Sequence, residues 1–174
     1  MLPSLALVLG GAASGKSRWA EALIRESGAK RLYIATAEAY DDEMRDKIAQ
    51  HKAARAEDGW TTIEAPMEVA PALAEARPDQ AVLLDCATLW LSNHMLAEHD
   101  LNAAENGLIA ALAACAAPVI VVSNEVGLSV VPDNALARRF RRAQGDLNKR
   151  LAAEADLVVQ MIAGLPLVLK GALP

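Results

Sequence analysis

The chain has 174 residues, of which 53% are apolar and 22% are charged, and its formal net charge is −5. This length suits one domain spanning residues 1–174 with one core, and the composition is that of a soluble globular protein. The acidic balance and the 3% of aromatic residues argue against nucleic acid as a partner, because nucleic-acid binders usually carry a basic surplus or stacking aromatics.

Short apolar runs alternate with stretches of helical spacing along the chain. In chain order we predict strand Leu5–Leu9, helix Ser17–Ser27, strand Arg31–Ala35, helix Asp42–Ala56, strand Trp60–Glu64, helix Met67–Ala76, strand Ala81–Asp85, helices Leu89–Glu98 and Ala103–Ala114, strand Val119–Ser123, and helix Asn134–Glu154. Leu157–Ile162 and Leu167–Lys170 follow as a C-terminal β-hairpin around Gly164 and Pro166. Continuous apolar strands alternating with helices indicate a mainly parallel sheet covered on both faces.

Neither a secretion signal nor a membrane span is predicted. The first apolar run, Leu5–Leu9, is short and has no basic segment before it, and no run approaches the roughly 18 apolar residues that span a bilayer. Cys86 and Cys115 lack the spacing of a zinc site or a disulfide framework. We therefore expect two reduced, buried thiols in a cytoplasmic protein without membrane insertion.

A phosphate-binding loop is the strongest motif in the chain. Gly10-Gly11-Ala12-Ala13-Ser14-Gly15-Lys16-Ser17 fits the pattern G-x-x-x-x-G-K-[S/T] and lies between a predicted strand and a predicted helix. The glycines let backbone N–H groups turn toward phosphate oxygens at a helix N-terminus. Lys16 would then reach the β- and γ-phosphates of a nucleotide, and the Ser17 hydroxyl would ligate Mg²⁺. A chance glycine-rich turn is the alternative, and the matching context disfavours it.

Polar residues also follow two other apolar strands. Asp85 ends a buried strand, where phosphate-loop proteins commonly place a carboxylate that holds Mg²⁺, although a helix N-cap is the alternative. Asn124 and Glu125 follow another strand, and strand ends of open α/β sheets lie beside the ligand crevice. A loop role for these two is equally open. No NKxD-like signature identifies the nucleotide base.

One stripe of the charged helix Asp42–Ala56 carries Met44, Ile48, His51 and Arg55. Met44 and Ile48 are predicted core contacts, so His51 should face the body of the protein. The cations around it, Lys47, Lys52 and Arg55, would attract phosphate. A neutral imidazole nitrogen can attack a nucleotide phosphorus and form a phosphoramidate. From helical spacing alone, a nucleophilic role for His51 and a purely structural role in packing are about equally well supported.

The other two histidines, His94 and His99, lie in the polar stretch "SNHMLAEHD" beside a predicted helix end. We predict surface or capping roles for both. Metal ligation would need further ligands at suitable spacing, and the sequence shows none.

Several segments together resemble one known family. They are "GGAASGKSRWAEALI", "LYIATAEAYDDEMRDKIAQHKAAR", "GWTTIEAP", "LLDCATLWLSN", "VSNEVGLSVVPDNALARRFRRAQGDLNKRLA" and "IAGLPLVLKG". The chain resembles the bifunctional adenosylcobinamide kinase/adenosylcobinamide-phosphate guanylyltransferases of cobalamin biosynthesis over nearly its whole length. The loop alone is shared by many families, whereas the combination of "YIAT", the histidine helix and "SNEVG…VP.N.LAR.FR" is specific.

The resemblance implies an activity and a fold. The family phosphorylates adenosylcobinamide with ATP or GTP, and then transfers GMP from GTP through a guanylylated histidine, giving adenosylcobinamide-GDP and pyrophosphate. By resemblance the fold is of the P-loop NTPase type (RecA-like), the protein forms homo-oligomers, namely trimers, and His51 is the histidine that carries GMP. The remaining positions that match nucleotide contacts of the family are Ala35, Thr36, Ala37, Lys52, Ala53, Ala54, Arg55, Glu64 and Asp85.

Two departures from the family pattern affect the predicted site. Ala13 stands where the family often has arginine, and Ala37 stands where some members have a polar residue. We expect the backbone cradle to tolerate both. Two other functions remain open: a phosphate-loop kinase for another small hydroxyl compound, with His51 structural, and a nucleotide-binding regulatory or assembly protein without phosphoryl transfer.

Overall fold

The structure, a computed structural model, describes residues 1–39 and 42–174, and the side chain of Lys47 also lies outside this description. The predicted place of Lys47 beside His51 therefore lies outside the described residues, as does Asp41, the residue before the predicted histidine helix.

The predicted elements occur in the predicted order. The strands are β1 (Leu5–Gly10), β2 (Lys30–Ala35), β3 (Trp60–Glu64), β4 (Gln80–Asp85), β5 (Val119–Asn124), β6 (Leu157–Ile162) and β7 (Leu165–Lys170). The helices are α1 (Lys16–Glu26), α2 (Asp42–Glu57), α3 (Val69–Ala74), α4 (Ala87–Leu96), α5 (Leu101–Ala114) and α6 (Ala135–Glu154). All predicted ends lie within two residues of the observed ones, and α3 is two residues shorter than predicted at each end.

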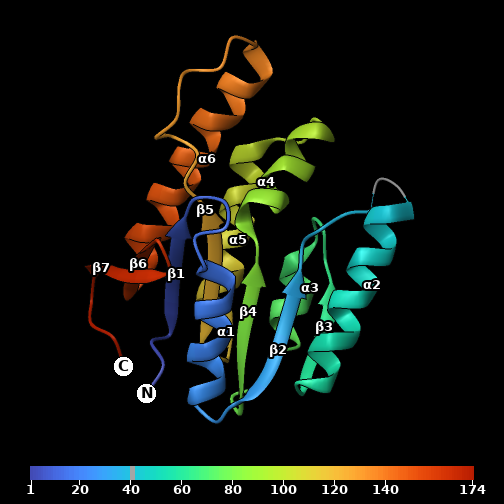
Figure 1. Cartoon of the computed structure of the whole chain (residues 1–174), viewed down its shortest axis with the longest axis vertical. Helices are drawn as coiled ribbons and strands as arrows, with labels where there is room; N and C mark the ends of the chain where they lie inside the picture. The colour runs from blue at the N-terminus through green and yellow to red at the C-terminus, as the bar shows by residue number, and fades with distance from the viewer. Residues whose placement is uncertain (40–41) are drawn as a thin grey trace.

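One sheet contains all seven strands in the order β3-β2-β4-β5-β1-β6-β7 (Figure 1). Every neighbouring pair is parallel except β6 and β7, which form the predicted antiparallel hairpin. The prediction of a mostly parallel P-loop NTPase-type sheet with a C-terminal hairpin is therefore confirmed. Because β1 to β6 are parallel, their carboxyl ends share one edge of the sheet, here called the carboxyl edge, and the loop after β1 lies there.

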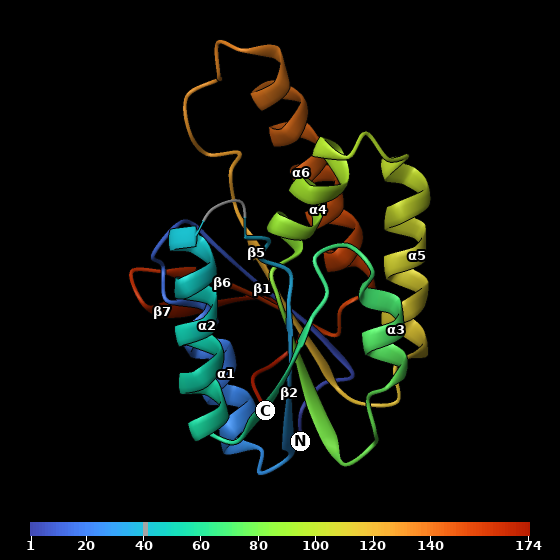
Figure 2. The same cartoon turned by 90° about the vertical axis from the view of Figure 1, so that its right-hand side faces the viewer.

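Helices cover both faces of the sheet. In the view of Figure 2, α1 and α2 lie on one side of the sheet and α3 to α6 on the other. The two faces bury separate clusters of mainly Ala, Leu and Val, one under α1 and one under α3 to α6. Cys86 is buried as predicted, whereas Cys115 is only partly buried. No helix in the described ranges is long and apolar enough to cross a bilayer.

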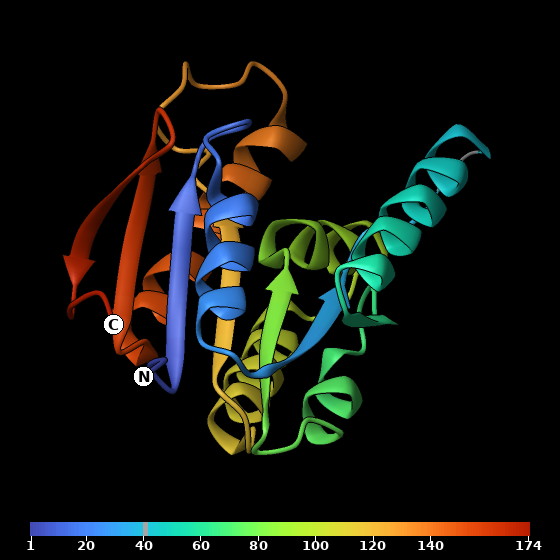
Figure 3. The same cartoon turned by 60° about the horizontal axis from the view of Figure 1, so that its bottom comes forward.

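The orientation predicted for the histidine helix is wrong. Of the four residues of the predicted stripe, Met44 is 40% exposed and His51 is exposed, while Ile48 and Arg55 are half-buried. The helix packs against β3, the last strand of the sheet, and leans away from the body (Figure 3). Two features explain this exposure. The stripe of α2 carries few apolar residues, and the edge strand β3 offers too narrow a surface to cover all of it.

The surface role predicted for His94 is also wrong. Its side chain is buried, its ring centroid lies 4.5 Å from that of Trp90, and its Nε2 lies 3.3 Å from the carbonyl oxygen of Met67. Burial lowers the pKa of His94 and so favours the neutral ring. The segment before α3 packs over α4 and covers a stretch that looks polar in sequence. His99 is exposed as predicted, with its Nδ1 3.0 Å from that of His94.

An ion pair fastens α6 to α5. Arg150 Nη1 donates to Oε2 of the buried Glu105 at 2.7 Å. Arg150→Met should lower the free energy of unfolding by about 2 kcal/mol, because it leaves a buried carboxylate without its charged donor. Urea unfolding measures the loss, and Glu105→Leu/Arg150→Met should restore most of it. Equal losses in the single and double variants would contradict the role of the unpaired charge.

Candidate functional site

The loop between β1 and α1 has the geometry of an anion cradle. Gly15, the N-cap of α1, has a φ of 89° and no side chain caps the helix, so the first N–H groups of α1 are not bonded by a capping side chain. Such groups, together with the helix dipole, favour a phosphate. A Cβ on Gly10 would lie 2.4 Å from Ser14 Oγ and 3.0 Å from the Met161 carbonyl oxygen, so a side chain there would displace the Ser14 hydroxyl.

Two side chains add polar groups to this cradle. Ser14 Oγ is buried and has no hydrogen-bond partner among the described residues. Lys16 Nζ donates to the Gly11 carbonyl oxygen at 2.9 Å, so the lysine bends back over the loop. A buried hydroxyl without a partner is costly, and a phosphate oxygen would satisfy it. Ala13, with a φ of 55°, is exposed, so its side chain lies away from this cradle.

The β6–β7 hairpin supports the loop from the other side. Gly164, in the turn of the hairpin, donates its N–H to the carbonyl oxygen of Ser14 at 3.2 Å. A Cβ on Gly15 would lie 3.5 Å from Gly164 Cα, so the two backbones are in close contact. The sequence predicted the hairpin but gave no signal that it reaches the loop, because the contact joins residues 150 positions apart.

A second group of site residues surrounds Asp85 at the end of β4. Tyr33 Oη donates to Asp85 Oδ2 at 2.8 Å, and the guanidinium carbon of Arg55 lies 3.8 Å from the centre of the Tyr33 ring. Burial, and then the Asp85 charge, raises the pKa of Tyr33, which keeps the phenol protonated as a donor. Tyr33, Arg55 and Asp85 are called the Asp85 cluster here, and Arg55 connects the last turn of α2 to it.

Glu21 on α1 also belongs to this group, and the sequence did not single it out. Burial raises the pKa of Glu21, and the charge of Asp85 adds to the effect. Glu21 lies one helical turn after Ser17, so spacing along α1 could have identified it as a neighbour of the phosphate loop. The two carboxylates bring negative charge to the carboxyl edge near the predicted Mg²⁺ ligands.

The other predicted nucleotide contacts differ in accessibility. The Thr36 side chain is fully buried, and its hydroxyl donates to the Cys86 carbonyl oxygen at 2.8 Å and accepts from the Cys86 N–H at 2.7 Å. Lys52 Nζ lies 2.7 Å from Glu64 Oε1, so these two predicted residues form an ion pair between α2 and β3. Of the four remaining predicted positions, Ala35 at the end of β2 is buried, Ala37 in the loop after β2 is half-buried, and Ala53 and Ala54 on α2 are exposed.

The end of β5 lies beside the phosphate loop. Glu125 donates its N–H to the Gly10 carbonyl oxygen at 3.0 Å, and Asn124 donates its N–H to Thr88 Oγ1 at 2.8 Å. Below them, Asn148 of α6 donates to the Asn124 carbonyl oxygen at 3.0 Å. The strand end is thus held at the carboxyl edge by α4 and α6, next to the cradle.

His51 is not brought to the phosphate loop in this structure. It is exposed on α2, which packs on β3, and four strand spacings of about 4.8 Å separate β3 from β1, or roughly 19 Å. Figures 1 and 3 both show α2 apart from the loop at the tip of β1. The structure therefore forms two groups, the phosphate cradle and the Asp85 cluster, with His51 beyond the second.

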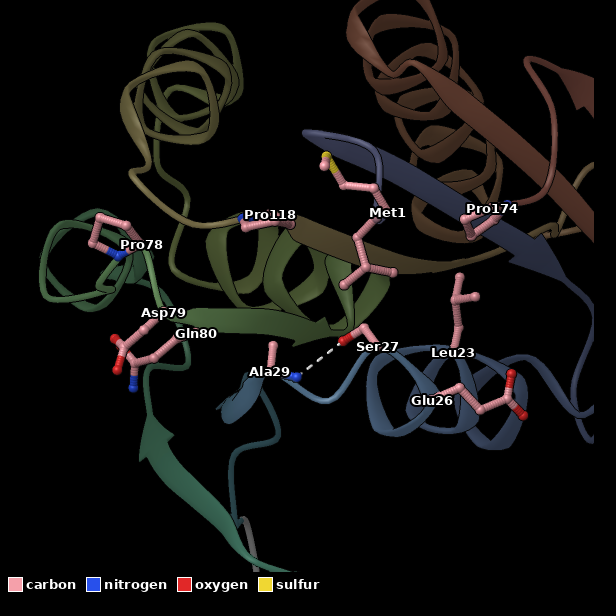
Figure 4. A pocket seen from close by; sticks show the side chains of 11 residues that line it. Met1, Leu23, Glu26, Ser27, Ala29, Pro78, Asp79, Gln80, Pro118 and Pro174 are labelled. Atoms are coloured by element: carbon pink, nitrogen blue, oxygen red, sulfur yellow. Dashed lines mark hydrogen bonds between the residues drawn. The ribbon is translucent and has the colours of Figure 1, made fainter.

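A hollow of about 430 Å³ at the opposite end of the sheet is not part of this site (Figure 4). It lies where strands begin, between Leu2, Leu23, Ala29, Gln80 and Pro118. In parallel α/β sheets ligands bind beyond the carboxyl ends of the strands. We therefore place the candidate site at the carboxyl edge.

Comparison with known families identifies the family of the chain. The profile of the family described as cobinamide kinase / cobinamide phosphate guanyltransferase matches residues 6–169. The chain belongs to this family. The prediction made from sequence motifs is confirmed at this level. Members of the cobinamide kinase / cobinamide phosphate guanyltransferase family are enzymes with the two activities that the family name states.

Two relatives illustrate the similarity within this family. The bifunctional adenosylcobalamin biosynthesis protein CobP of Pseudomonas aeruginosa is 44% identical over 168 residues, which cover 95% of this chain and 96% of the relative. The bifunctional adenosylcobalamin biosynthesis protein CobU of Escherichia coli is 39% identical, with 94% of this chain and 98% of the relative covered.

Two solved structures share the fold at low sequence identity. The flagellar accessory protein FlaH of Methanocaldococcus jannaschii superposes with a TM-score of 0.55 at 12% identity, covering 98% of this chain and 80% of FlaH. The RadB recombinase gives a TM-score of 0.51 at 18% identity, covering 91% of this chain and 74% of RadB. These likenesses show the RecA-like fold alone.

Proposed function

We propose that this chain, acting as one unit over residues 1–174, phosphorylates adenosylcobinamide with ATP or GTP and then transfers GMP from GTP to the new phosphate. The product would be adenosylcobinamide-GDP, made in the cytoplasm during cobalamin biosynthesis. One observation carries the proposal: a chain of this family has, at Gly10–Ser17, an uncapped helix N-terminus beside a buried Ser14 hydroxyl without a partner in the described part of the chain. Both features fit a nucleotide phosphate.

In the kinase step, the loop would hold the β- and γ-phosphates of the nucleotide. Lys16 would turn from the Gly11 carbonyl oxygen to these phosphates, which are the stronger acceptors. The hydroxyl oxygen of adenosylcobinamide attacks the γ-phosphorus, the bond to the β-phosphate oxygen breaks, and the nucleoside diphosphate leaves. A base in the site would take the hydroxyl proton, and Glu21, Asp85 and Glu125 are carboxylates at the carboxyl edge.

Ser17 and Asp85 are the residues that would hold Mg²⁺. Among the described residues there is no group of three or more His, Cys, Asp or Glu side chains that could hold a metal alone. Mg²⁺ is commonly held by one or two protein oxygens and completed by substrate phosphates and water, so the hydroxyl and carboxylate fit. Tyr33 donates to Oδ2 of Asp85, a bond that would orient this carboxylate. Bound Mg²⁺ would neutralise charge on the phosphates.

In the guanylyl step, an imidazole nitrogen of His51 would attack the α-phosphorus of GTP. The bond to the β-phosphate oxygen breaks, pyrophosphate leaves, and GMP remains on His51 as a phosphoramidate. A phosphate oxygen of the acceptor then attacks the same phosphorus and releases the histidine. The step requires α2 to approach the cradle, and the small packing surface of α2 is compatible with such a shift.

The exposure of His51 argues against the alternative that the protein is a plain kinase. That interpretation gives His51 a structural role, but an exposed side chain on the outside of α2 stabilises little. The test is transfer of label from GTP carrying ³²P at its α-phosphate to the protein. Acid-labile, alkali-stable label on His51 supports the proposal, and no label under turnover conditions overturns it in favour of the plain kinase.

We also propose that the chain associates into homo-oligomers, as trimers by resemblance to the family. All six residues of the edge strand β7 are exposed, including Leu165 at 70%, Leu167 at 50% and Leu169 at 54%. An exposed apolar edge strand is a surface that proteins usually cover. The mass in solution, measured by sedimentation, tests this proposal, and a monomer at micromolar concentration would contradict it.

Removing the Tyr33 hydroxyl tests the part assigned to Asp85. Tyr33→Phe should raise the Mg²⁺ concentration needed for half-maximal kinase activity about tenfold, because the carboxylate loses the donor that orients it. Mg²⁺ titration of the kinase rate at saturating nucleotide measures the shift. Tyr33 is buried and Trp60 packs on its ring, so phenylalanine keeps the packing. An unchanged Mg²⁺ requirement would contradict the role of the hydroxyl.

A further inference from the structure

The outer face of α6 carries a groove that the two reaction steps described above do not use. The groove, of about 430 Å³, lies between α6 and residues 125–134, and it is called the basic groove here. Its charged lining residues are Arg138, Arg141, Arg142, Asp146 and Lys149. These residues lie on the side of α6 away from its buried residues Gln144, Leu147, Asn148 and Leu151, so they do not serve the core.

The charges of the basic groove are not balanced. The one carboxylate among its lining residues, Asp146, forms an ion pair with Lys149, whose Nζ lies 2.7 Å from Asp146 Oδ1. No carboxylate in residues 1–39 or 42–174 forms an ion pair with Arg138, Arg141 or Arg142. The groove therefore has four cations against one anion, in a chain whose formal net charge is −5. Such a local surplus attracts an anion.

Two of the arginines donate hydrogen bonds to residues 125–134, which form the rim of the groove. Arg138 Nη1 donates to the Pro132 and Asp133 carbonyl oxygens, at 3.0 and 2.6 Å, and Arg141 Nη2 donates to the Gly127 carbonyl oxygen. A guanidinium has five N–H donors, so both keep donors for a ligand. Arg142 is exposed and makes no such bond to the rim within the described part of the chain. Holding the rim therefore does not account for Arg142.

Gly145 opens the groove at mid-helix. Glycine in a helix interior costs about 1 kcal/mol relative to alanine. A Cβ at Gly145 would meet nothing within 4 Å, so packing within this chain does not require glycine there. Gly145 lies between Arg141, Arg142 and Lys149 on the face that lines the groove. A backbone without a side chain lets another molecule approach closely, so the glycine points to an occupant from outside the chain.

The location of the groove relates it to the candidate site. Its rim begins directly after β5, where Glu125 donates to the Gly10 carbonyl oxygen beside the phosphate cradle. On this rim Leu128, Val130 and Val131 are 84%, 90% and 66% exposed. Cations beside uncovered aliphatic side chains suit a ligand that joins a phosphate to a large, partly apolar body.

We propose that the basic groove binds the phosphate group of the phosphorylated corrinoid, the acceptor of the guanylyl step. This inference rests on the proposed function and adds to it where the acceptor sits. The nucleotide phosphates have their own cradle at the end of β1, and the groove supplies a separate set of donors. A phosphate monoester carries up to two negative charges, so it matches a surplus of arginine donors, whereas the unphosphorylated corrinoid alcohol does not.

Two variants test the groove by equilibrium dialysis of adenosylcobinamide phosphate, a coloured ligand, against the pure protein. Arg142→Ala should raise its dissociation constant about tenfold, which is the loss of one charge-assisted hydrogen bond. Arg139→Ala removes the same charge from an exposed residue that does not line the groove, and should change the constant less than twofold. Equal effects of the two variants would overturn the proposal in favour of general attraction by charge.

Gly145→Ala provides the second variant. It should raise the melting temperature, because alanine favours the helix, and yet weaken binding of adenosylcobinamide phosphate about tenfold by filling the groove. Gly107→Ala in α5 is the matched control, since a Cβ there also meets nothing within 4 Å. It should raise the melting temperature without changing binding. A Gly145→Ala protein that binds the ligand normally but changes its mass in solution would overturn the proposal and assign the groove to a subunit contact.

The outcome for the groove is separable from that for the proposed function. Labelling of the unaltered protein by α-labelled GTP reports on the function, whereas dialysis of the phosphorylated corrinoid needs no nucleotide. Unphosphorylated adenosylcobinamide should bind equally to Arg142→Ala and to the unaltered protein. If Arg142→Ala weakens binding of adenosylcobinamide as much as binding of its phosphate ester, the groove does not recognise the phosphate group and the proposal fails.

Discussion

His51→Ala should abolish transfer of label from α-labelled GTP to the protein and reduce formation of adenosylcobinamide-GDP by roughly a thousandfold or more, because the covalent route loses its nucleophile. The same variant should still phosphorylate adenosylcobinamide, since that step transfers the γ-phosphate directly. Because His51 is exposed on α2, the substitution should leave the free energy of unfolding within about 0.5 kcal/mol.

Gln50→Ala is the matched control, an exposed neighbour on the same helix. It should become labelled at the rate of the unaltered protein. Acid treatment should release the label and alkali should not, as expected of a phosphoramidate. Label that survives in His51→Ala would show that another residue carries GMP, and loss of both activities together would point to a general effect on nucleotide binding.

Lys16→Ala should weaken binding of ATP and of GTP by about ten- to a hundredfold, because one charge-assisted contact with the phosphates is lost. Both activities should fall by more than binding, since the lysine also stabilises the charge that develops on the transferring group. In the structure its Nζ contacts only a loop carbonyl oxygen among the hydrogen bonds of the described residues, so the fold should persist. Nucleotide affinity by calorimetry and both rates measure the effect.

Arg18→Ala is the control for Lys16→Ala, because it removes the same charge from an exposed position two residues along α1. It should keep nucleotide affinity within about twofold. If Lys16→Ala binds GTP as tightly as the unaltered protein, the loop between β1 and α1 is not the nucleotide site. If Lys16→Ala lowers only one of the two activities, the nucleotide phosphates are bound differently in the kinase step and in the guanylyl step.

The fold and the phosphate loop could be predicted from sequence because both depend on local patterns. Strand, glycine loop and helix follow one another within Leu5–Glu26, and each has a short signature. The hairpin was predicted for the same reason, from two apolar runs around Gly164. Tertiary contacts only adjusted the ends of these elements.

The environments of His51 and His94 were mispredicted, and both errors have the same cause. Helical spacing says which residues share a face but not what lies opposite that face. Helix α2 packs mainly against the edge strand β3, so His51 is exposed, whereas the segment around Met67 covers His94. Burial of either residue depends on tertiary contacts, which periodicity does not report.

The basic groove and the contact between the hairpin and the loop could not be predicted either. The arginines of α6 look in sequence like a solvated helix face, and only the path of residues 125–134 makes them line a groove. Gly145 gives no signal in sequence, because a glycine inside a helix has many explanations. The structure excludes tight packing within the chain as the explanation, because a Cβ on Gly145 would meet nothing within 4 Å.

The bond between Gly164 and Ser14 has a consequence for how the protein is made. The phosphate cradle is encoded by residues 10–17, yet it is buttressed by β6, which pairs with β1, and by the turn that follows β6. On the ribosome those residues are synthesised about 150 positions later, at roughly 5–20 residues per second. A nascent chain would therefore carry its nucleotide motif for many seconds in an unsupported form. The supported form of the cradle can therefore exist only after β6 and the turn that follows it have been synthesised.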